Sequence, residues 1–410
     1  MSLTDTTRKM ASIRKIASLS PIENSDFLEV ATMENLGWKV VVKKGEFKVG
    51  DQVIYLEIDS AINVKDLIEP LKFLEEKCAK TLFTGRTPET SAFCEKYVRI
   101  KTIKLRGQVS QGLILPLKTV LDALPVDRLY AEDGSMLTMT FDGGEDWTNY
   151  LKVEVWDRLV EWFEERSQLG PRAQSHAAGN FPSDVPKTDE PRLQGLMEYF
   201  SDPEMTEAEW ECTVKNDGSS STLFYRPMTW NAETGKEPMQ IASRRFLLKD
   251  DGGSDDWFEV FKRLGWDELK KKFETIYEYG LVTGVYGELP AKHELAIQGE
   301  MTGPKYNGNR DKNTENHFRV FRIFDITDQK FICPGLRYAV CNFLGLEHVK
   351  VLETCKIFHK LKTLDDFLAY ADGPSESGNN KREGVVFKRV DDGSLSFKIV
   401  SNNYLLKCGD

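Results

Sequence analysis

Hydrophobic and polar residues alternate along the first part of the chain in the way that antiparallel strands require. The strand-like runs lie at 27–30, 38–42, 52–56 and 97–105, with glycine-containing turns and a helical or irregular insert over 64–80 between them. Successive side chains of a strand point to opposite faces, so each run can bury one face and expose the other. Several short strands over about 120 residues predict a small β-barrel, and the OB fold is the leading candidate.

The second part of the chain alternates strand-like and helical stretches, and a linker separates it from the first. The stretch 167–192 is rich in glycine and proline, which is typical of a domain boundary. The expected divisions are an OB-type domain over 1–120, a connecting segment and linker over 121–175, and a second domain over 176–410. The predicted fold class is α+β, with the barrel followed by antiparallel sheets flanked by helices.

Four basic residues stand in and just after the last run of the barrel: Arg99, Lys101, Lys104 and Arg106. On a strand Arg99 and Lys101 share one face, while their hydrophobic neighbours take the other. One interpretation is a solvated barrel face. The other is a surface that follows the backbone of a nucleic acid, because cationic grooves on such barrels bind phosphates. The pattern leaves both interpretations open.

Composition narrows the class of protein. The 410 residues are 40% hydrophobic and 29% charged, which is ordinary for a soluble globular protein. The sequence has no apolar stretch long enough to span a membrane, and its N-terminus lacks the apolar core of a secretion signal. We therefore expect an intracellular protein, cytoplasmic or nuclear. Basic residues at positions 8, 9, 14 and 15 leave organelle targeting open, although Asp5 favours a solvated start.

Net charge and the cysteine and histidine content exclude several kinds of site. The net charge of −10 argues against a protein that coats nucleic acid over its whole surface, but it says little about one local groove. The seven cysteines lack CxxC spacing, and the five histidines form no metal-ligand spacing. Neither a zinc site nor a histidine-based nucleophile relay is therefore expected.

The stretch Lys215–Ser220, with the sequence KNDGSS, is the most informative turn of the chain. An apolar run over 210–214 leads into it and a strand-like run over 222–225 leaves it, so Lys215 stands at a strand end. An Asp-Gly pair between two such runs predicts a hairpin. The lysine points to chemistry, because a desolvated amine beside other cations can lose its proton and attack phosphorus.

Four later stretches also place charges at strand edges: Ser243–Arg245, Gln298–Met301, Glu383–Lys388 and Phe397–Ser401. A site that transfers a phosphoryl group needs this combination of side chains. It requires a nucleophilic amine, carboxylates for a divalent cation, and further cations for the charge that develops on phosphorus.

Together these stretches resemble the ordered motifs of the covalent nucleotidyltransferases, the superfamily of ATP-dependent DNA ligases, RNA ligases and mRNA capping enzymes. Lys215–Gly218 resembles the KxxG motif I, Ser243–Arg244 motif Ia, Gln298–Met301 motif III, Arg319–Ile326 motif IIIa, Glu383–Lys388 motif IV and Phe397–Ser401 motif V. Six motifs in one order over about 190 residues make the resemblance specific.

The ends of the chain indicate the branch of this superfamily. DNA ligases and capping enzymes carry an OB domain after motif V, whereas here the barrel comes first and twelve residues follow Lys398. This layout, the segment 181–192 and the ending Ser401–Lys407 resemble the ATP-dependent RNA ligases, in which an N-terminal OB domain precedes an adenylyltransferase domain. The alternatives are a DNA ligase, a capping-type guanylyltransferase and a non-catalytic nucleic-acid-binding protein, and the intact motif residues argue against the last.

The resemblance implies an enzyme that repairs RNA by joining 3′-hydroxyl and 5′-phosphate ends, chiefly at nicks in duplexes, and that acts as a monomer. In this scheme Lys215 attacks the α-phosphorus of ATP, AMP passes to the 5′-phosphate, and the 3′-hydroxyl displaces the AMP. The resemblance also implies Mg²⁺ or Mn²⁺, held by Glu383 through water. That cation and Lys398 would lower the pKa of Lys215.

The nucleotide-binding residues that the resemblance implies are Arg192, Gly218, Arg244, Glu300, Phe324, Lys388 and Lys398. Glu300 would accept a hydrogen bond from the ribose and Phe324 would stack on adenine, while Arg244 and Lys398 would contact phosphate. Val400 stands where several RNA ligases have a second motif V lysine, and Lys388 is the candidate replacement. Plainer interpretations stay open for four residues: a salt bridge for Glu383, core packing for Phe324, a rim position for Lys388 and linker solvation for Arg192.

Overall fold

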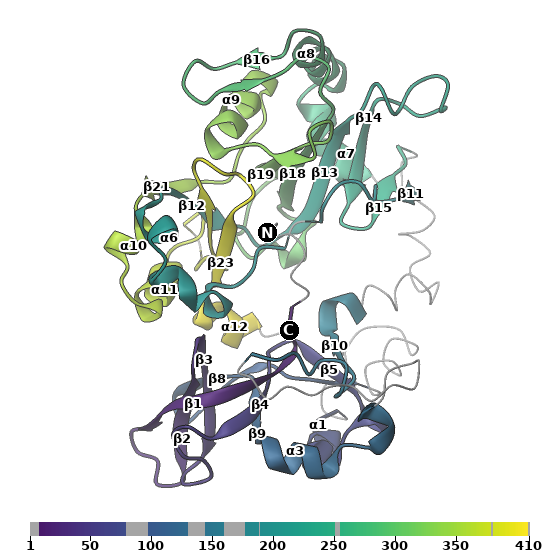
Figure 1. The fold of residues 1–410 in the computed structure, drawn as a ribbon. Coiled ribbons are helices and arrows are strands. Elements are labelled where there is room, and N and C mark those ends of the chain that lie inside the picture. Colours follow the sequence, from purple (N-terminus) through teal and green to yellow (C-terminus); the bar gives the residue numbers. More distant parts are fainter. Residues whose placement is uncertain are drawn as a thin grey trace. The chain divides into compact units, whose positions relative to one another are not determined.

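The computed structural model describes residues 8–78, 97–129, 144–159, 177–187, 189–250, 255–378 and 380–408. They form two compact units, one chiefly from the described residues between 5 and 171 and the other chiefly from those between 198 and 404 (Figure 1). Much of the connecting segment predicted over 121–175 lies outside the described residues. In the part of the chain that is described, no helix is long and apolar enough to cross a membrane.

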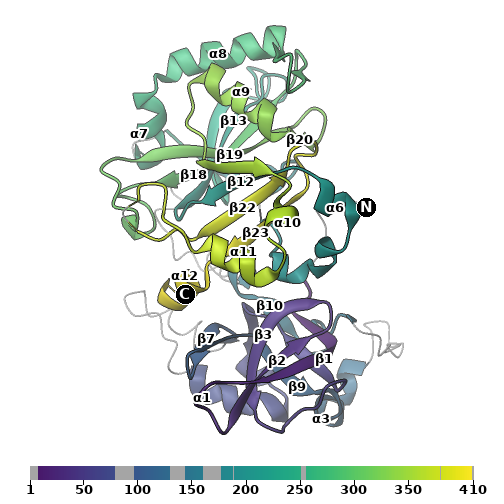
Figure 2. The same ribbon diagram turned by 90° about the vertical axis from the view of Figure 1, so that its left-hand side faces the viewer.

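The N-terminal unit contains a five-stranded antiparallel barrel (Figure 2). Its strands are β1 (Ala11–Pro21), β2 (Leu28–Met33), β3 (Leu36–Lys43), β4 (Gln52–Leu56) and the consecutive pair β8 (Gln108–Gln111) and β9 (Leu113–Pro116). Five of them form one hydrogen-bonded sheet in the order β3-β2-β1-β4-β9, and β8 lies outside this sheet. The barrel closes where β8 packs against β3, and there the Val41 N–H donates to Ser110 Oγ at 2.9 Å. This closed arrangement agrees with the predicted OB-type fold.

The bend between β8 and β9 requires a glycine. Gly112 has a φ of 105°, and a Cβ at this position would collide with the buried ring of Tyr55. The Tyr55 hydroxyl donates to the carbonyl of Gln111 at 3.1 Å, which fixes the bend from inside the barrel. The remaining elements of this unit are β5 (Ser60–Asn63), β6 (Tyr97–Arg99), β7 (Thr102–Leu105), β10 (Val153–Val155), α1 (Glu75–Cys78), α3 (Leu117–Ala123), η2 (Val64–Asp66), η3 (Glu69–Leu74) and η4 (Val126–Leu129).

The second unit is built on two antiparallel sheets. In hydrogen-bonded order the seven-stranded sheet contains β11 (Ala177–Asn180), β15 (Phe246–Leu248), β14 (Met239–Ser243), β13 (Ser219–Tyr225), β18 (Leu295–Thr302), β19 (His317–Asp325) and β20 (Lys330–Phe331). The four-stranded sheet contains β21 (Val351–Cys355), β12 (Trp210–Lys215), β22 (Gly384–Arg389) and β23 (Ser396–Val400).

The strands on either side of Lys215 belong to different sheets. β12 pairs with β21 and β22, whereas β13 pairs with β14 and β18. The predicted hairpin is therefore wrong, because the two strands do not pair with each other. The turn that carries Lys215 instead links the two sheets, and it brings residues from both sheets to one place.

Helices cover both sheets (Figure 2). α7 (Asp255–Arg263), α8 (Trp266–Tyr279) and α9 (Pro334–Leu344) pack on the seven-stranded sheet, and α10 (Ile357–Lys360) and α11 (Leu364–Ala371) pack on the four-stranded sheet. The remaining elements are α6 (Pro203–Glu207), α12 (Asn402–Cys408), β16 (Leu281–Val282), β17 (Glu288–Leu289), η5 (Leu193–Gly195), η6 (Met197–Phe200) and η7 (Asn307–Asn309). The α+β prediction of antiparallel sheets flanked by helices is confirmed.

Alternate residues of β22 and β23 face the hydrophobic core on one side of the four-stranded sheet and a cavity on the other. The rings of Phe387 and Phe397 stack with centroids 4.8 Å apart, and they contact the rings of α10 and α11. The next residue on each strand, Lys388 or Lys398, points to the opposite face. Both lysines line a cavity there.

Candidate active site

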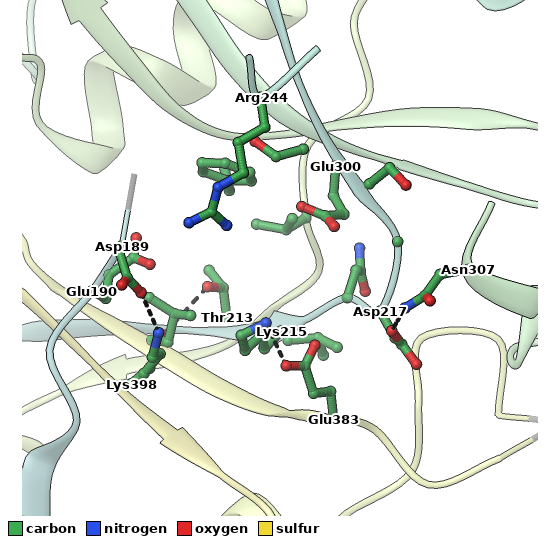
Figure 3. A pocket seen from close by; sticks show the side chains of 18 of the residues that line it. Asp189, Glu190, Thr213, Lys215, Asp217, Arg244, Glu300, Asn307, Glu383 and Lys398 are labelled. Atoms are coloured by element: carbon green, nitrogen blue, oxygen red, sulfur yellow. Dashed lines mark hydrogen bonds and ion pairs between the residues drawn. The ribbon is translucent and has the colours of Figure 1, made fainter. Parts of the chain in front are cut away.

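A cavity of about 540 Å³ lies between the two sheets of the second unit, and residues of both sheets line it. This volume is in the range of cavities that hold small-molecule ligands. Figure 3 shows Arg244 and Glu300 on one side of the open space and Lys215, Glu383 and Lys398 on the other. The sequence motifs I, Ia, III, IV and V therefore meet in one place.

Lys215 and Glu383 form an ion pair at the centre of this site. Lys215 Nζ lies 2.6 Å from Glu383 Oε1. The strands produce this contact, because Lys215 pairs in register with Gly384, the residue after Glu383. A Cβ on Gly384 would collide with the backbone of the neighbouring strand β23, so the motif needs a glycine there to let the strands approach.

The protonation of Lys215 differs from the expectation drawn from the sequence. Burial alone would lower the pKa of Lys215, but the carboxylates of Glu383 and Glu300 outweigh burial and raise the pKa above its ordinary value. Lys398 supplies little opposing charge, since its Nζ pairs with Asp189 Oδ1 at 2.5 Å. Without further positive charge in the site, the amine of Lys215 is held as a cation.

Three carboxyl groups, those of Asp217, Glu300 and Glu383, line the cavity together with Lys215. Glu300 lies opposite Ser220 on the neighbouring strand, and burial together with Glu383 and Asp217 raises its pKa to about 8 despite the nearby Lys215. Burial and Glu383 also raise the pKa of Asp217. Buried carboxylates that repel one another are suitable ligands for a divalent cation. The residues present therefore fit a Mg²⁺ or Mn²⁺ site that includes Glu383.

Asp217 has a set of partners that the sequence motifs did not reveal. Asn307 Nδ2 donates to one carboxylate oxygen, and Arg310 Nη1 lies 3.3 Å from the other. The Tyr404 hydroxyl also interacts electrostatically with this carboxylate, and the centroid of the Tyr404 ring lies 4.5 Å from the guanidinium carbon of Arg310. The sequence motifs do not include Arg310, and the resemblance of the ending Ser401–Lys407 assigns no role to Tyr404, because both residues lie far from Asp217 in the chain.

Lys388 lies at the floor of the cavity and not at its rim. The residue is 2% exposed, and its Nζ lies 3.9 Å from Glu190 Oε1. Burial lowers the pKa of Lys388 to about 8. Among the described residues its Nζ has no hydrogen-bond partner. A buried donor of this kind is expected to meet a polar group of a ligand, so the rim interpretation is wrong.

Glu190 is a site residue that the sequence motifs missed. Burial would raise the pKa of this carboxyl, but Lys388 and Arg322 outweigh burial and lower it. The segment that carries Glu190 runs beside β23, where the Lys398 N–H donates to the carbonyl of Pro191 at 2.8 Å. Arg192 follows in the same segment and bridges to Lys398 through its backbone, but it does not line the cavity.

Gly218 and Arg244 line the cavity as predicted. A Cβ on Gly218 would collide with the carbonyl of Met301, so only glycine lets the turn pass this close to β18. Arg244 follows β14, and its guanidinium points into the open space in Figure 3.

The aromatic residue of motif IIIa that lines the cavity is Phe321 and not Phe324. A β-bulge opposite Gln298 and Gly299 leaves Phe321 as the extra residue of β19, and Phe321 is part of the cavity wall. Phe324 is 4% exposed in a core cluster, with its ring centroid 4.9 Å from that of Phe331. The adenine-stacking role predicted for Phe324 does not fit this position.

We expect the Phe321→Ala variant to raise the KM for ATP about tenfold, since stacking a base on an aromatic ring contributes about 1–3 kcal/mol. Phe321 and Val386 come from opposite sheets and both line the cavity, so a planar base can lie between them. The matched control is Phe324→Leu, which should lower the melting temperature and leave the KM unchanged. A raised KM in Phe324→Leu alone would restore the original assignment.

The basic run of the N-terminal unit divides into two kinds of residue. Arg99 Nη2 lies 2.8 Å from Asp59 Oδ1, its side chain is 8% exposed, and its guanidinium stacks on Trp156. The predicted phosphate contact of Arg99 is wrong, because a buried ion pair holds its charge. Lys104 and Arg106 are exposed on the hairpin of β7 and β8, and Lys101 is half-buried just before it.

Comparisons with known proteins agree with this architecture. A family model described as an OB-fold domain matches residues 10–117, and one described as RNA ligase matches residues 208–400. A comparison with curated proteins gave no match.

Solved structures of Naegleria gruberi RNA ligase are similar along nearly the whole chain. A mutant with ATP and Mn has 29% identity and a TM-score of 0.71, covering 98% of this chain and 100% of that chain. The structure with PPi has 29% identity and a TM-score of 0.70, covering 97% and 98%. An apo mutant has 28% identity and a TM-score of 0.70, covering 97% of each chain. The resemblance drawn from the sequence motifs and the predicted fold class are confirmed.

Proposed function

We propose that this chain, an ATP-dependent RNA ligase of the covalent nucleotidyltransferase superfamily, joins a 3′-hydroxyl to a 5′-phosphate at nicks in duplex RNA and acts as a monomer. The observation that carries the proposal is the position of Lys215 in a nucleotide-sized cavity, 2.6 Å from Glu383 and lined by the other motif residues. The solved structures of Naegleria gruberi RNA ligase with ATP and Mn, with AMP and Mn, and with PPi support the choice of nucleotide and of a divalent cation.

The reaction proceeds in three phosphoryl transfers. Lys215 Nζ attacks the α-phosphorus of ATP, so that a P–N bond forms and pyrophosphate leaves. An oxygen of the RNA 5′-phosphate then attacks the same phosphorus, and the P–N bond breaks. Finally the RNA 3′-hydroxyl oxygen attacks the 5′-phosphorus and AMP leaves. Each step depends mainly on placing reactants and cations around phosphorus.

The residues of the cavity divide these tasks. Arg244 and Lys398 supply positive charge for the phosphate, and Glu300 accepts a hydrogen bond from the ribose. Lys388 and Glu190 offer a donor and an acceptor at the cavity floor, the pair that the edge of a base needs. Arg192 stays a candidate nucleotide-binding residue, with a role limited to positioning Lys398 through their backbone bridge.

A divalent cation held by Glu383 supplies positive charge that lowers the pKa of a neighbouring amine and stabilises charge on phosphate oxygens. Glu383 is the residue best placed to hold it, because its carboxylate lies beside the nucleophile. Our proposed domain division assigns these nucleotide steps to residues 176–410 and RNA binding to the barrel over 1–120, with 121–175 as the connecting segment and linker.

The proposal is tested with two RNA strands annealed on a complement, with a 3′-hydroxyl and a 5′-phosphate at the nick. We expect the protein with ATP and Mg²⁺ to seal this nick faster than it joins the same strands without the complement. Replacing the 5′-phosphate by a 5′-hydroxyl should prevent sealing. Sealing of all-DNA nicks alone would favour the DNA ligase alternative, and a covalent adduct with GTP in place of ATP would favour the capping-type alternative.

The exposed hairpin of the barrel predicts a salt-dependent contribution to RNA binding. Replacing both Lys104 and Arg106 by alanine should reduce the slope of log affinity against log salt by about two, since each phosphate contact contributes about 0.9. Adenylylation of Lys215 should be unchanged. The control is Lys118→Ala on α3, a lysine with an 84% exposed side chain in the same unit. An equal change of slope in that control would remove the specific role of the hairpin.

A further inference from the structure

The segment after β23 reaches the turn that carries Lys215. The Ser401 N–H donates to the carbonyl of Glu383 at 2.8 Å, and Ser401 Oγ donates to Asp372 at 2.9 Å. These bonds fix the start of α12, and Tyr404 then lines the main cavity. Tyr404 also lines a second, narrow cavity next to Lys215, Asp217 and Glu383. The segment is therefore part of the wall around the nucleophile.

Tyr404 and Arg310 together hold the side chain of Asp217. Arg310 Nη1 lies 3.3 Å from Asp217 Oδ2, and the Tyr404 hydroxyl interacts electrostatically with the same carboxylate. The guanidinium carbon of Arg310 also lies 4.5 Å from the centroid of the Tyr404 ring. The aspartate side chain is 8% exposed, so these partners and Asn307 account for most of its surroundings.

The position of Asp217 bears directly on Lys215. Only Asn216 separates the two residues, and Asn216 is itself held by Glu376, whose Oε2 accepts from its Nδ2 at 3.1 Å. The turn thus has one anchor at each of the two residues that follow the lysine. Because the turn also links the two sheets, its anchors decide where Lys215 Nζ stands relative to groups on both.

We infer that Tyr404 is a positioning residue for the two steps in which AMP enters and leaves Lys215, because through Asp217 it fixes the turn that carries the lysine. The inference rests on the proposed function. Lys215 Nζ gains a bond to phosphorus in the first step and loses it in the second. In the third step the 3′-hydroxyl displaces AMP from RNA and Lys215 changes no bond. A loose turn should therefore slow the first two steps and spare the third.

The test measures the steps separately in the full chain. Formation of the lysyl-AMP adduct is followed with labelled ATP, and AMP transfer is followed from the isolated adduct to a 5′-phosphate RNA. Sealing is followed with RNA that already carries AMP on its 5′ end. We expect Tyr404→Phe, which keeps the ring under Arg310 and loses the hydroxyl, to slow adduct formation about tenfold. Sealing of the pre-adenylylated RNA should stay within about twofold of the unchanged protein.

A second variant and a control make the result decisive. Tyr404→Leu, which also removes the ring from Arg310, should slow adduct formation more than Tyr404→Phe does. The control Tyr338→Phe removes a hydroxyl from an exposed residue of α9 and should change no step. Equal slowing of all three steps would show a merely structural role, and full activity of Tyr404→Phe in every step would show no role. Both outcomes overturn the inference, whereas absence of any adduct in the unchanged protein would instead overturn the proposed function.

Discussion

Replacement of Lys215 by alanine is expected to abolish the covalent AMP adduct that forms with labelled ATP and a divalent cation. The P–N bond of the adduct requires an amine beside the α-phosphorus, and two other lysines line the described part of the cavity. Lys398 is paired with Asp189 at 2.5 Å, and Lys388 lies at the cavity floor, 3.9 Å from Glu190. Neither stands beside Glu383, so neither can substitute for Lys215. The adduct is measured as acid-labile, hydroxylamine-sensitive label on the denatured chain.

The control for this prediction is Lys362→Ala, which removes an exposed lysine of the same unit and should leave labelling unchanged. The Lys215→Ala protein should still seal RNA that already carries AMP on its 5′ end, because Lys215 changes no bond in that step. Such residual sealing would demonstrate an intact fold. Label retained on the Lys215→Ala chain would show that another residue is the nucleophile.

The parts of this protein that follow a local rule could be predicted from the sequence. Period-two alternation identified β2, β3 and β4 of the barrel and the strands of motifs IV and V, because a half-buried strand must alternate wherever it lies in the chain. It did not identify β1, β8 or β9. The motif glycines followed from a similar constraint. Gly218 and Gly384 stand where a Cβ would collide with a neighbouring backbone, so the motif spacing itself carries the geometry.

The partners of each strand could not be predicted in this way. The turn at Lys215 has every local feature of a hairpin, yet β12 pairs with β22, whose residues come some 170 positions later in the chain. Pairing depends on which distant strands bury one another's apolar faces, and alternation alone does not encode it. The sequence therefore located the nucleophile but not the two sheets that enclose it.

Single side chains were misassigned where tertiary contacts override the pattern. Arg99 alternates like an exposed cation, but Asp59 and Trp156 bury it. Phe324 was expected to line the nucleotide cavity as a residue of motif IIIa. A β-bulge in β19 instead places Phe321 in the cavity wall. Tyr404 lies in the ending that resembles the RNA ligases, but the sequence assigned it no role, because Asp217 lies nearly 190 residues earlier in the chain.

Glu383→Gln is expected to lose adduct formation by about a hundredfold or more, even though this substitution makes Lys215 easier to deprotonate. Glu383 is the strongest of the groups that raise the pKa of Lys215, while burial lowers it. Removing the negative charge at 2.6 Å should therefore leave a larger fraction of neutral, nucleophilic amine. Loss of a metal-holding carboxylate acts in the opposite direction and costs the positive charge that phosphoryl transfer requires.

These opposed effects distinguish a metal-holding role of Glu383 from a plain ion pair. If Glu383 only paired with Lys215, the Gln variant would form the adduct as fast as the unchanged protein or faster at neutral pH. If it holds the divalent cation, the variant should be slow, and raising the Mg²⁺ or Mn²⁺ concentration should recover part of the rate. The control is Glu278→Gln, which alters an exposed carboxylate that pairs with Lys292 at 2.5 Å and does not line the cavity. Rapid, metal-independent labelling of the Glu383→Gln protein would assign Glu383 to the ion pair alone.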